Sequence, residues 1–99
     1  MDATYEFSGE LWEWGGKATW VFVTLPPELA DEIEDRVPLK GGFGSVKVHV
    51  RIGETEWNTS LFPNKSIGSY VLPIKRAVRE REHLPIGATA DLEIILVGV

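Results

Sequence analysis

The stretch VKVHVRI, Val46–Ile52, decides the fold class of this chain. Apolar side chains at positions 46, 48, 50 and 52 alternate with polar side chains at 47, 49 and 51, which is the period of a strand buried on one face. The same alternation recurs over residues 5–12 and over residues 89–97, where the second face turns apolar at its end. These segments predict a protein built mainly from half-buried β-strands.

Turn residues delimit the remaining strands. Gly15 and Gly16 separate the first strand from an extended run over residues 18–25, and because glycine tolerates positive φ this arrangement predicts a hairpin. Two further extended runs cover residues 55–62 and 67–72. The sequence therefore predicts six strands.

Two helical segments interrupt the strands. The first begins after Leu25, where two prolines suit a helix N-terminus, and it ends at Pro38. The second extends from about Pro73 to His83. Each segment has apolar side chains at helical spacing and charged side chains elsewhere, which is typical of a helix with one buried face.

The residues around the two helices recur at a constant spacing of 47 residues. The matching pairs are Leu25-Pro26 with Leu72-Pro73 and Val37-Pro38-Leu39 with Leu84-Pro85-Ile86. This pattern predicts an internal duplication with halves of about residues 1–52 and 53–99. Halves of this size are too small to bury separate cores, so we expect them to interlock into one barrel domain, residues 1–99. The alternative is two unrelated segments that share common prolines.

The composition indicates one small domain and excludes several classes of protein. The chain has 99 residues, of which 43% are hydrophobic and 25% charged, so it supplies one core. The lack of cysteine excludes a disulfide scaffold, a thiolate metal site and a cysteine nucleophile. No apolar run approaches the roughly 18 residues of a membrane span, and no secretory signal is visible. We therefore expect a cytoplasmic protein that does not enter a membrane.

One segment resembles the swapped-hairpin transition-state regulators and antitoxins, which are homodimeric barrels that bind DNA. The resemblance rests on residues 70–79, YVLPIKRAVR, followed by residues 84–87, LPIG. These residues match the strand-Pro-helix-Gly-strand unit of those proteins. The resemblance implies that nucleic-acid binding is one function to consider.

Over nearly all of its length the chain is more similar to a family of small prokaryotic domains of unknown function. The segments that carry this similarity are Phe7-Ser8-Gly9, Trp20 to Pro26, Val46-Lys47-Val48, Thr59 to Pro63, Gly68-Ser69-Tyr70 and Leu72 to Lys75. The resemblance implies a pseudo-duplicated double-split β-barrel of six or seven strands with two short helices, a domain that sometimes precedes a bacteriocin-protection-type domain. It implies no catalytic or ligand residues. Relatives commonly have Gly-Asp where this chain has Gly87-Ala88, so any role of that acid is absent here.

Charge is distributed unevenly along the chain. Residues 1–35 carry a net charge of −8 and residues 36–81 a net charge of +6, although the whole chain carries −5. The overall charge argues against indiscriminate nucleic-acid binding, whereas the asymmetry suits an anionic partner or a second copy of the chain. The favoured alternative is a set of solvated faces whose charges pair with one another.

Lys47, His49 and Arg51 form a row on one face of the predicted strand, about 7 Å apart per step. Such a row suits phosphates or carboxylates, and Trp57 on a neighbouring strand would add a surface for base stacking. These four are the candidate ligand-binding residues. The alternative, which we favour, is an ordinary solvated face whose cations meet acids such as Glu56 beyond the next turn.

The four tryptophans are many for a chain of this length. Trp20 belongs to a run that is apolar on both faces, so it is predicted to lie in the core. Trp12 and Trp14 approach the hairpin tip, where they form either a binding or dimer surface or a layer packed under a helix.

Enzymatic signals are weak. The histidines are His49 and His83, and neither has the spacing of a catalytic triad or a metal site. There is also no phosphate-binding loop. We therefore assign no catalytic residue, metal or cofactor. A small enzyme that uses either histidine would require a concave pocket with a carboxylate or hydroxyl nearby.

Together these observations predict a non-enzymatic binding or interaction module for an unknown anionic ligand or a protein partner. Nucleic-acid binding by residues 36–81 is the first alternative, and a small enzyme is the second. The chain is expected to be a monomer or a homodimer through its last strand, where Ile95, Val97 and Val99 turn apolar side chains outward.

Overall fold

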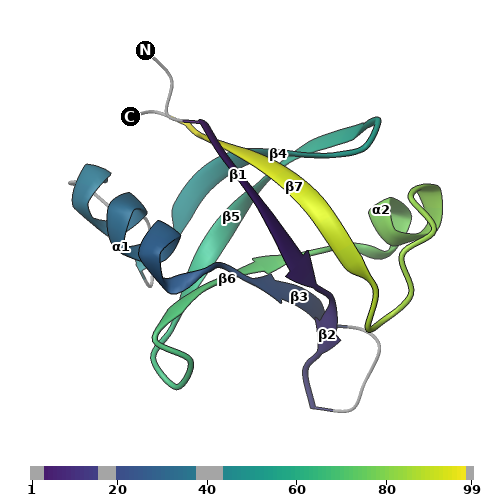
Figure 1. Cartoon of the computed structure of the whole chain (residues 1–99), viewed down its shortest axis with the longest axis horizontal. Helices are drawn as coiled ribbons and strands as arrows, with labels where there is room; N and C mark the ends of the chain where they lie inside the picture. Colours follow the sequence, from purple (N-terminus) through teal and green to yellow (C-terminus); the bar gives the residue numbers. More distant parts are fainter. Residues whose placement is uncertain (1–3, 16–19, 38–43, 98–99) are drawn as a thin grey trace.

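A computed structural model describes residues 4–15, 20–37 and 44–97, which form a sheet curled into a half-barrel with the two helices at opposite sides (Figure 1). The elements are β1 (Thr4–Glu10), β2 (Trp12–Glu13), β3 (Val21–Thr24), α1 (Pro27–Arg36), β4 (Val46–Ile52), β5 (Thr55–Asn64), β6 (Ser69–Pro73), α2 (Arg76–Arg81) and β7 (Thr89–Leu96). The strands of this part of the chain form one antiparallel sheet in the order β1-β7-β4-β5-β6-β3-β2. The mainly β fold of six or seven strands with two short helices is confirmed.

The core fills the concave side of the curled sheet. In β4, Val46, Val48, Val50 and Ile52 are buried, while the three residues between them face outward. The pattern recurs in β7, where alternate residues from position 90 to 96 are buried. Residues of α1 and α2 complete the same core cluster. The alternation in the sequence therefore identified the buried faces correctly.

The sheet curls because β1 passes close to β3. A Cβ atom added to Gly9 of β1 would lie 2.3 Å from Cγ1 of Val23, which is fully buried in β3. The chain after β1 is tied to the segment before β7, since the Leu11 N–H donates to Ala88 O at 2.9 Å and the Gly87 N–H donates to Leu11 O at 2.8 Å. Only glycine leaves room for an approach of this kind.

β5 changes its neighbours along its length. It pairs with β4 from Thr55 to Leu61, but with β6 only from Phe62 to Asn64. β6 then pairs with β3 over Val71–Pro73. The first half of β5 and the end of β6 therefore diverge, and a groove opens between them.

The strand order agrees with the predicted duplication. If the two halves are equivalent, β1 corresponds to β5, β3 to β6 and β4 to β7. The β1–β7 pairing then corresponds to the β5–β4 pairing, and the β3–β6 and β4–β7 pairings each correspond to themselves. The same correspondence relates the β5–β6 pairing to the approach of β1 to β3. The duplication itself stays a prediction.

The second helix differs from its predicted bounds. α2 begins at Arg76, because Pro73 still pairs with Phe22 in the sheet and the Ile74 N–H donates to Val21 O at 2.9 Å. Sheet pairing keeps these residues extended, although a proline there suits a helix start. The helix ends before His83, whose φ is 54°. No helix in the described ranges is long and apolar enough to cross a membrane.

The prediction that Trp20 lies in the core is wrong, because 59% of this residue is exposed. Trp20 precedes β3, and its carbonyl accepts a hydrogen bond from the Trp14 N–H at 2.8 Å. Val21 and Val23 supply the inward face of the strand. The side chain of Trp20 therefore lies on the exposed side of this end of the hairpin.

The last strand lies inside the sheet, between β1 and β4. Both of its backbone edges are therefore engaged over the paired residues. Ile95 is half-buried and Val97 is exposed, whereas Val99 lies outside the described residues. A homodimer through this strand stays a prediction, and it would have to use side chains rather than edge pairing.

Candidate functional site

A groove of about 580 Å³ lies where β5 and β6 diverge. Residues from four segments line it: Trp20 and Val21 at the start of β3, Trp57, Asn58 and Thr59 of β5, Pro73, Ile74 and Lys75 at the end of β6, and Arg76 and Arg79 of α2. The volume is within the range of small-molecule sites. The groove therefore exists because β5 and β6 pair over only part of their length.

The groove is positively charged. Its described lining residues include three cations, Lys75, Arg76 and Arg79, and no carboxylate. The side chain of Arg79 is held in place by a hydrogen bond, in which its Nε–H donates to Ile74 O at 3.1 Å. Arg76 lies 3.5 Å from Glu80, but both side chains are mostly exposed, so this pair is weak. Lys75 and Arg76 are therefore exposed cations that an anion can reach, in a chain whose net charge is negative.

Two tryptophans form the aromatic part of the groove. Trp57, which is only 9% exposed, lies at the base of the groove, and Trp20, which is largely exposed, lies at the rim of the groove. An indole face open to solvent is a surface on which a flat ring can stack. The groove therefore combines cations and aromatic faces within one hollow.

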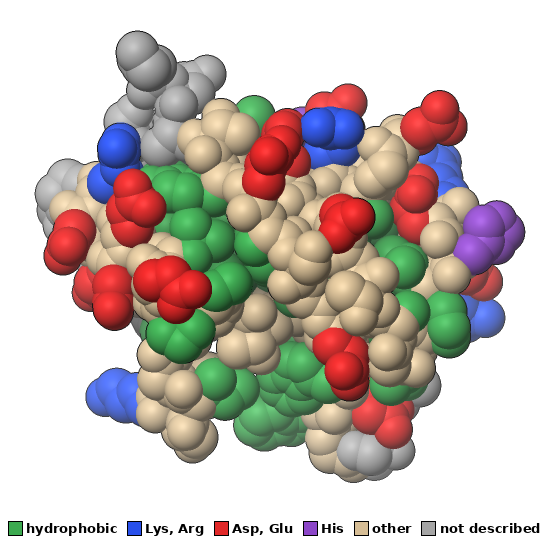
Figure 2. Space-filling view, viewed as in Figure 1, with side chains coloured by type: hydrophobic (Ala, Val, Ile, Leu, Met, Phe, Trp, Pro, Cys, Tyr) green, Lys and Arg blue, Asp and Glu red, His purple; other side chains and the backbone are tan. Residues whose placement is uncertain are grey.

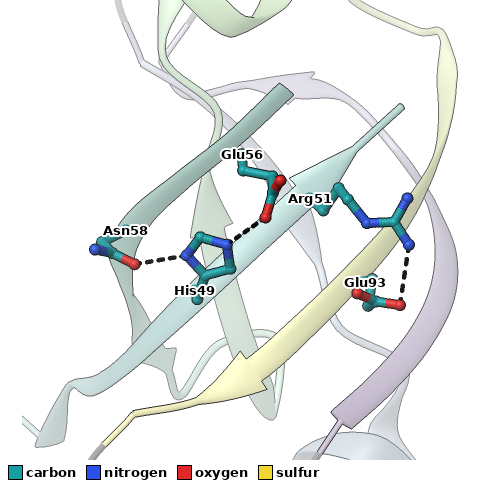
Figure 3. Close-up of polar contacts among 5 residues, drawn as sticks. All are labelled: His49, Arg51, Glu56, Asn58 and Glu93. Atoms are coloured by element: carbon teal, nitrogen blue, oxygen red, sulfur yellow. Dashed lines mark hydrogen bonds and ion pairs between the residues drawn. The ribbon is translucent and has the colours of Figure 1, made fainter. Parts of the chain in front are cut away.

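The predicted row of Lys47, His49 and Arg51 lies outside this groove, on the outward face of β4. Figure 3 shows His49 and Arg51 of this row with their partners. His49 Nε2 lies 2.8 Å from Oε1 of Glu56 on β5. Arg51 donates from Nη2 to Oε2 of Glu93 on β7 at 3.0 Å. The cross-strand pairing with Glu56 agrees with the solvated-face interpretation.

His49 has a second partner, Asn58 of β5, whose Oδ1 lies 2.8 Å from the imidazole Nδ1. The hydrogen bond to Glu56, and to a smaller extent the one to Asn58, raises the pKa of His49 above its usual 6.5, because both contacts favour the protonated ring. His49 is therefore held between two residues of the neighbouring strand.

Trp57 does not join the row. Glu56 and Asn58 face outward toward β4, so the residue between them turns to the inward side of the sheet. The structure therefore separates the four sequence-predicted site residues into the outward row and the groove. Asn58 is the residue that belongs to both, since it contacts His49 and also lines the groove.

A second aromatic group lies on the outer face of the β2–β3 hairpin. Trp12 packs on Phe22 with a ring-centroid separation of 5.4 Å, and its Nε1–H donates to Thr24 Oγ1 at 2.9 Å. Trp14 is 6.4 Å from Trp12 and largely exposed. Figure 2 shows hydrophobic side chains gathered between this hairpin and the turn that joins β5 to β6. Trp12 therefore packs against β3, and Trp14 is open to solvent.

His83 lines a separate hollow of about 460 Å³ together with Arg76, Arg79, Glu80 and two apolar residues. Within the described residues its ring makes no hydrogen bond to Glu80. His49 lines neither the groove nor this second hollow. Among those residues no cluster of three or more histidines and acids is placed to hold a metal ion.

Sequence reasoning missed the cations of the groove. The pattern of the second helical segment predicts that Lys75, Arg76 and Arg79 belong to its charged side, and their spacing alone does not reveal what they face. The available signal was their position directly after an apolar, proline-containing strand end within the basic part of the chain. Only the approach of β3 and β5 turns these residues into a site.

A family model described as "Domain of unknown function (DUF1905)" matches residues 7–94. The matched range extends from β1 to β7 and includes all the described residues that line the groove. No curated protein matches the chain.

Proposed function

The chain belongs to the DUF1905 family of domains of unknown function, and from the lining of its groove we propose that it is a non-enzymatic binding module. Its ligand is an anion that also carries a flat aromatic ring, and the ligand lies in the groove between β5 and α2. The described lining residues include no histidine or carboxylate that could act as a general base, which supports binding without turnover.

The carrying observation is the set of three cations without a carboxylate among the described lining residues. Two opposite charges 4 Å apart in water attract by about 1 kcal/mol, which is roughly a fivefold effect on affinity for each exposed cation. The exposed pair of Arg76 with Glu80 competes only weakly. Lys75 and Arg76 together should therefore dominate the recognition of the anionic group.

The aromatic ring of the ligand is assigned to Trp20. More than half of this residue is exposed, which is unusual for so large an apolar side chain, and it lies at the groove rim. Stacking on an aromatic side chain contributes about 1–3 kcal/mol per ring. Trp57, which is buried, forms the floor beneath it.

A matched set of probes tests this proposal by NMR titration of the ¹⁵N-labelled protein. The probes are 2-naphthalenesulfonate, which has a ring and a permanent negative charge, 2-naphthalenemethanol, which has the ring alone, and inorganic sulfate, which has the charge alone. We expect 2-naphthalenesulfonate to bind at least about tenfold more tightly than either of the others. The indole N–H signals of Trp20 and Trp57 should shift most.

Variants locate the binding. The double variant Lys75→Gln, Arg76→Gln should weaken binding of 2-naphthalenesulfonate about tenfold, and Trp20→Ala about fivefold. Arg81→Gln on the same helix and Trp14→Ala on the same hairpin are the controls, because neither residue lines the groove. Equal affinity for all three probes, or equal losses in the control variants, would contradict the proposal.

Nucleic acid is the alternative ligand, because one nucleotide combines a flat ring with a phosphate. Its case is weakened by the dispersal of cations outside the groove, where Arg51 is held by Glu93 at 3.0 Å. Titration with single-stranded oligonucleotides at about 50 and 200 mM salt distinguishes the two, since several phosphate contacts would make affinity fall steeply with salt.

A cytoplasmic location is part of the proposal. It is supported by the lack of cysteine, which suits a reducing compartment. Fractionation of cells that express the tagged full-length protein tests it.

A further inference from the structure

Asn58 connects the outward face of the sheet to the groove. Its side-chain oxygen lies 2.8 Å from His49 Nδ1, and the same residue lines the groove beside Trp57 and Thr59. Figure 3 shows the amide oxygen turned to the imidazole and the amide nitrogen pointing away from it. One residue therefore contacts a titratable group and also lines the candidate site.

The second contact of His49 determines where its protons lie. Nε2 is 2.8 Å from Oε1 of Glu56, and because a carboxylate only accepts hydrogen bonds, Nε2 must carry a proton. A protonated ring also carries a proton on Nδ1, which then donates to the Asn58 oxygen as in this structure. In the neutral ring Nδ1 is a bare acceptor, and a hydrogen bond with Asn58 then requires the amide nitrogen to turn toward it.

The amide of Asn58 has two ends with opposite hydrogen-bonding properties, so its orientation changes what lies away from His49. With the oxygen on His49, the NH₂ group is the end turned away from His49 (Figure 3), and this end can donate to an anion. With the NH₂ group on His49, the amide oxygen is the end turned away from His49, and its partial negative charge repels an anion. The observed arrangement is the one that favours an anionic ligand.

Resting on the function proposed above, we propose that Asn58 selects the charge of the ligand and that the protonation of His49 sets which end of the Asn58 amide the ligand meets. Asn58 is thus a specificity-determining residue, and His49 is a positioning residue that acts through it. The groove binds anions more tightly when His49 is protonated.

The surroundings of His49 favour its protonated form. The hydrogen bonds to Glu56 on β5 and then to Asn58 contribute most, burial opposes them, and the negative charges of Glu56 and of Glu93 on β7 add to the preference. Arg51 on the same strand is held by Glu93, and Lys47 is the other charged neighbour on β4. The residue opposite His49 on β7 is Ile95, which carries no charge. The pKa of His49 is consequently raised above 6.5.

The test is the affinity for 2-naphthalenesulfonate between pH 5.5 and 8.5, measured by the same NMR titration. The sulfonate stays ionised over this range, so a change in affinity comes from the protein. We expect affinity to fall about three- to tenfold as pH rises through the pKa of His49. His49→Ala and Asn58→Ala should each remove this dependence, whereas Ser60→Ala, on the outward side of β5 and outside the groove, should retain it.

Asn58→Ala separates the amide mechanism from a simple effect of charge, because His49 still titrates in this variant. A pH dependence that persists in Asn58→Ala would overturn the inference and leave the proposed function intact. So would an affinity that is sensitive to Lys75→Gln, Arg76→Gln but independent of pH in the natural protein. Failure of 2-naphthalenesulfonate to bind at any pH would instead overturn the proposed function, and with it this inference.

Discussion

Gly9→Ala tests the approach of β1 to β3 that curls the sheet. The added Cβ would lie 2.3 Å from Val23 Cγ1, whereas carbon atoms in contact are normally about 3.5–4.0 Å apart, so one side must move by more than about 1 Å. Val23 cannot move freely, because it is fully buried and paired with Leu72 of β6. Overpacking of this kind costs about 1–3 kcal/mol of folding free energy.

The sign of the effect is informative. Without a steric conflict, Gly→Ala stabilises a protein by about 0.4–1 kcal/mol, because it restricts the unfolded chain. We therefore expect Gly9→Ala to lower the folding stability, whereas the same substitution at an open site would raise it. Urea unfolding followed by tryptophan fluorescence measures the difference, and a midpoint temperature lowered by about 4–8 °C per kcal/mol should accompany it. Glu10→Ala, on the outward face of β1, is the control and should change stability by less than about 0.5 kcal/mol.

A double-mutant cycle identifies the partner. Val23→Ala alone removes buried methyl groups and destabilises the protein, but it also removes the atom that the new Cβ of Gly9→Ala would meet. The double variant should therefore be at least about 1 kcal/mol more stable than the sum of the single effects predicts. Additivity within about 0.5 kcal/mol, or a stabilising Gly9→Ala, would refute the close approach of the two strands.

Three further predictions concern titration and packing. Burial, and a hydrogen bond to a carboxylate, raise the pKa of Tyr70 well above 10. The unfolding free energy should therefore fall as pH rises above 10, because the unfolded chain then loses the tyrosine proton more easily than the folded protein. In urea titrations, Tyr70→Phe should reduce this loss of stability at alkaline pH. Histidine NMR titration should give His49 a pKa above 6.5 that falls in Glu56→Gln, since that hydrogen bond is the largest cause of the shift; an unchanged pKa would contradict the contact. In β7, Ile94→Ala should cost about 2–5 kcal/mol and Ile95→Ala about 1 kcal/mol or less in urea unfolding, because only Ile94 is fully buried; similar costs would show that the faces are misassigned.

Local patterns predicted most of the fold correctly. The alternation in Val46–Ile52 identified both the strand and its buried face. α1, which starts at Pro27, was recognised from its prolines and its apolar stripe. These features depend on neighbouring residues and on the period of the backbone, so they can be read without knowledge of the rest of the chain.

Predictions failed where a distant segment decided the outcome. The pairing of Pro73 with Phe22 overrode the preference of a proline for a helix start. Trp20 follows the pattern of a buried strand, but 59% of it is exposed. For Pro73 the deciding neighbour lies far away along the sequence, and for Trp20 the deciding feature is its position in the folded sheet, which no local pattern encodes.

The candidate site shows the same division. The sequence by itself determined that cations follow the strand end at Pro73, that tryptophans lie on the hairpin and on β5, and that His49 alternates with valines. Only the tertiary structure decided that Trp57 turns away from His49, that Asn58 touches both His49 and the groove, and that α2 closes the groove with its cations. The reason is physical. Residue type and spacing set the chemistry of each side chain and the face on which it lies. The groove, in contrast, exists only because β5 and β6 pair over a few residues and diverge elsewhere, and that divergence depends on how the whole sheet closes.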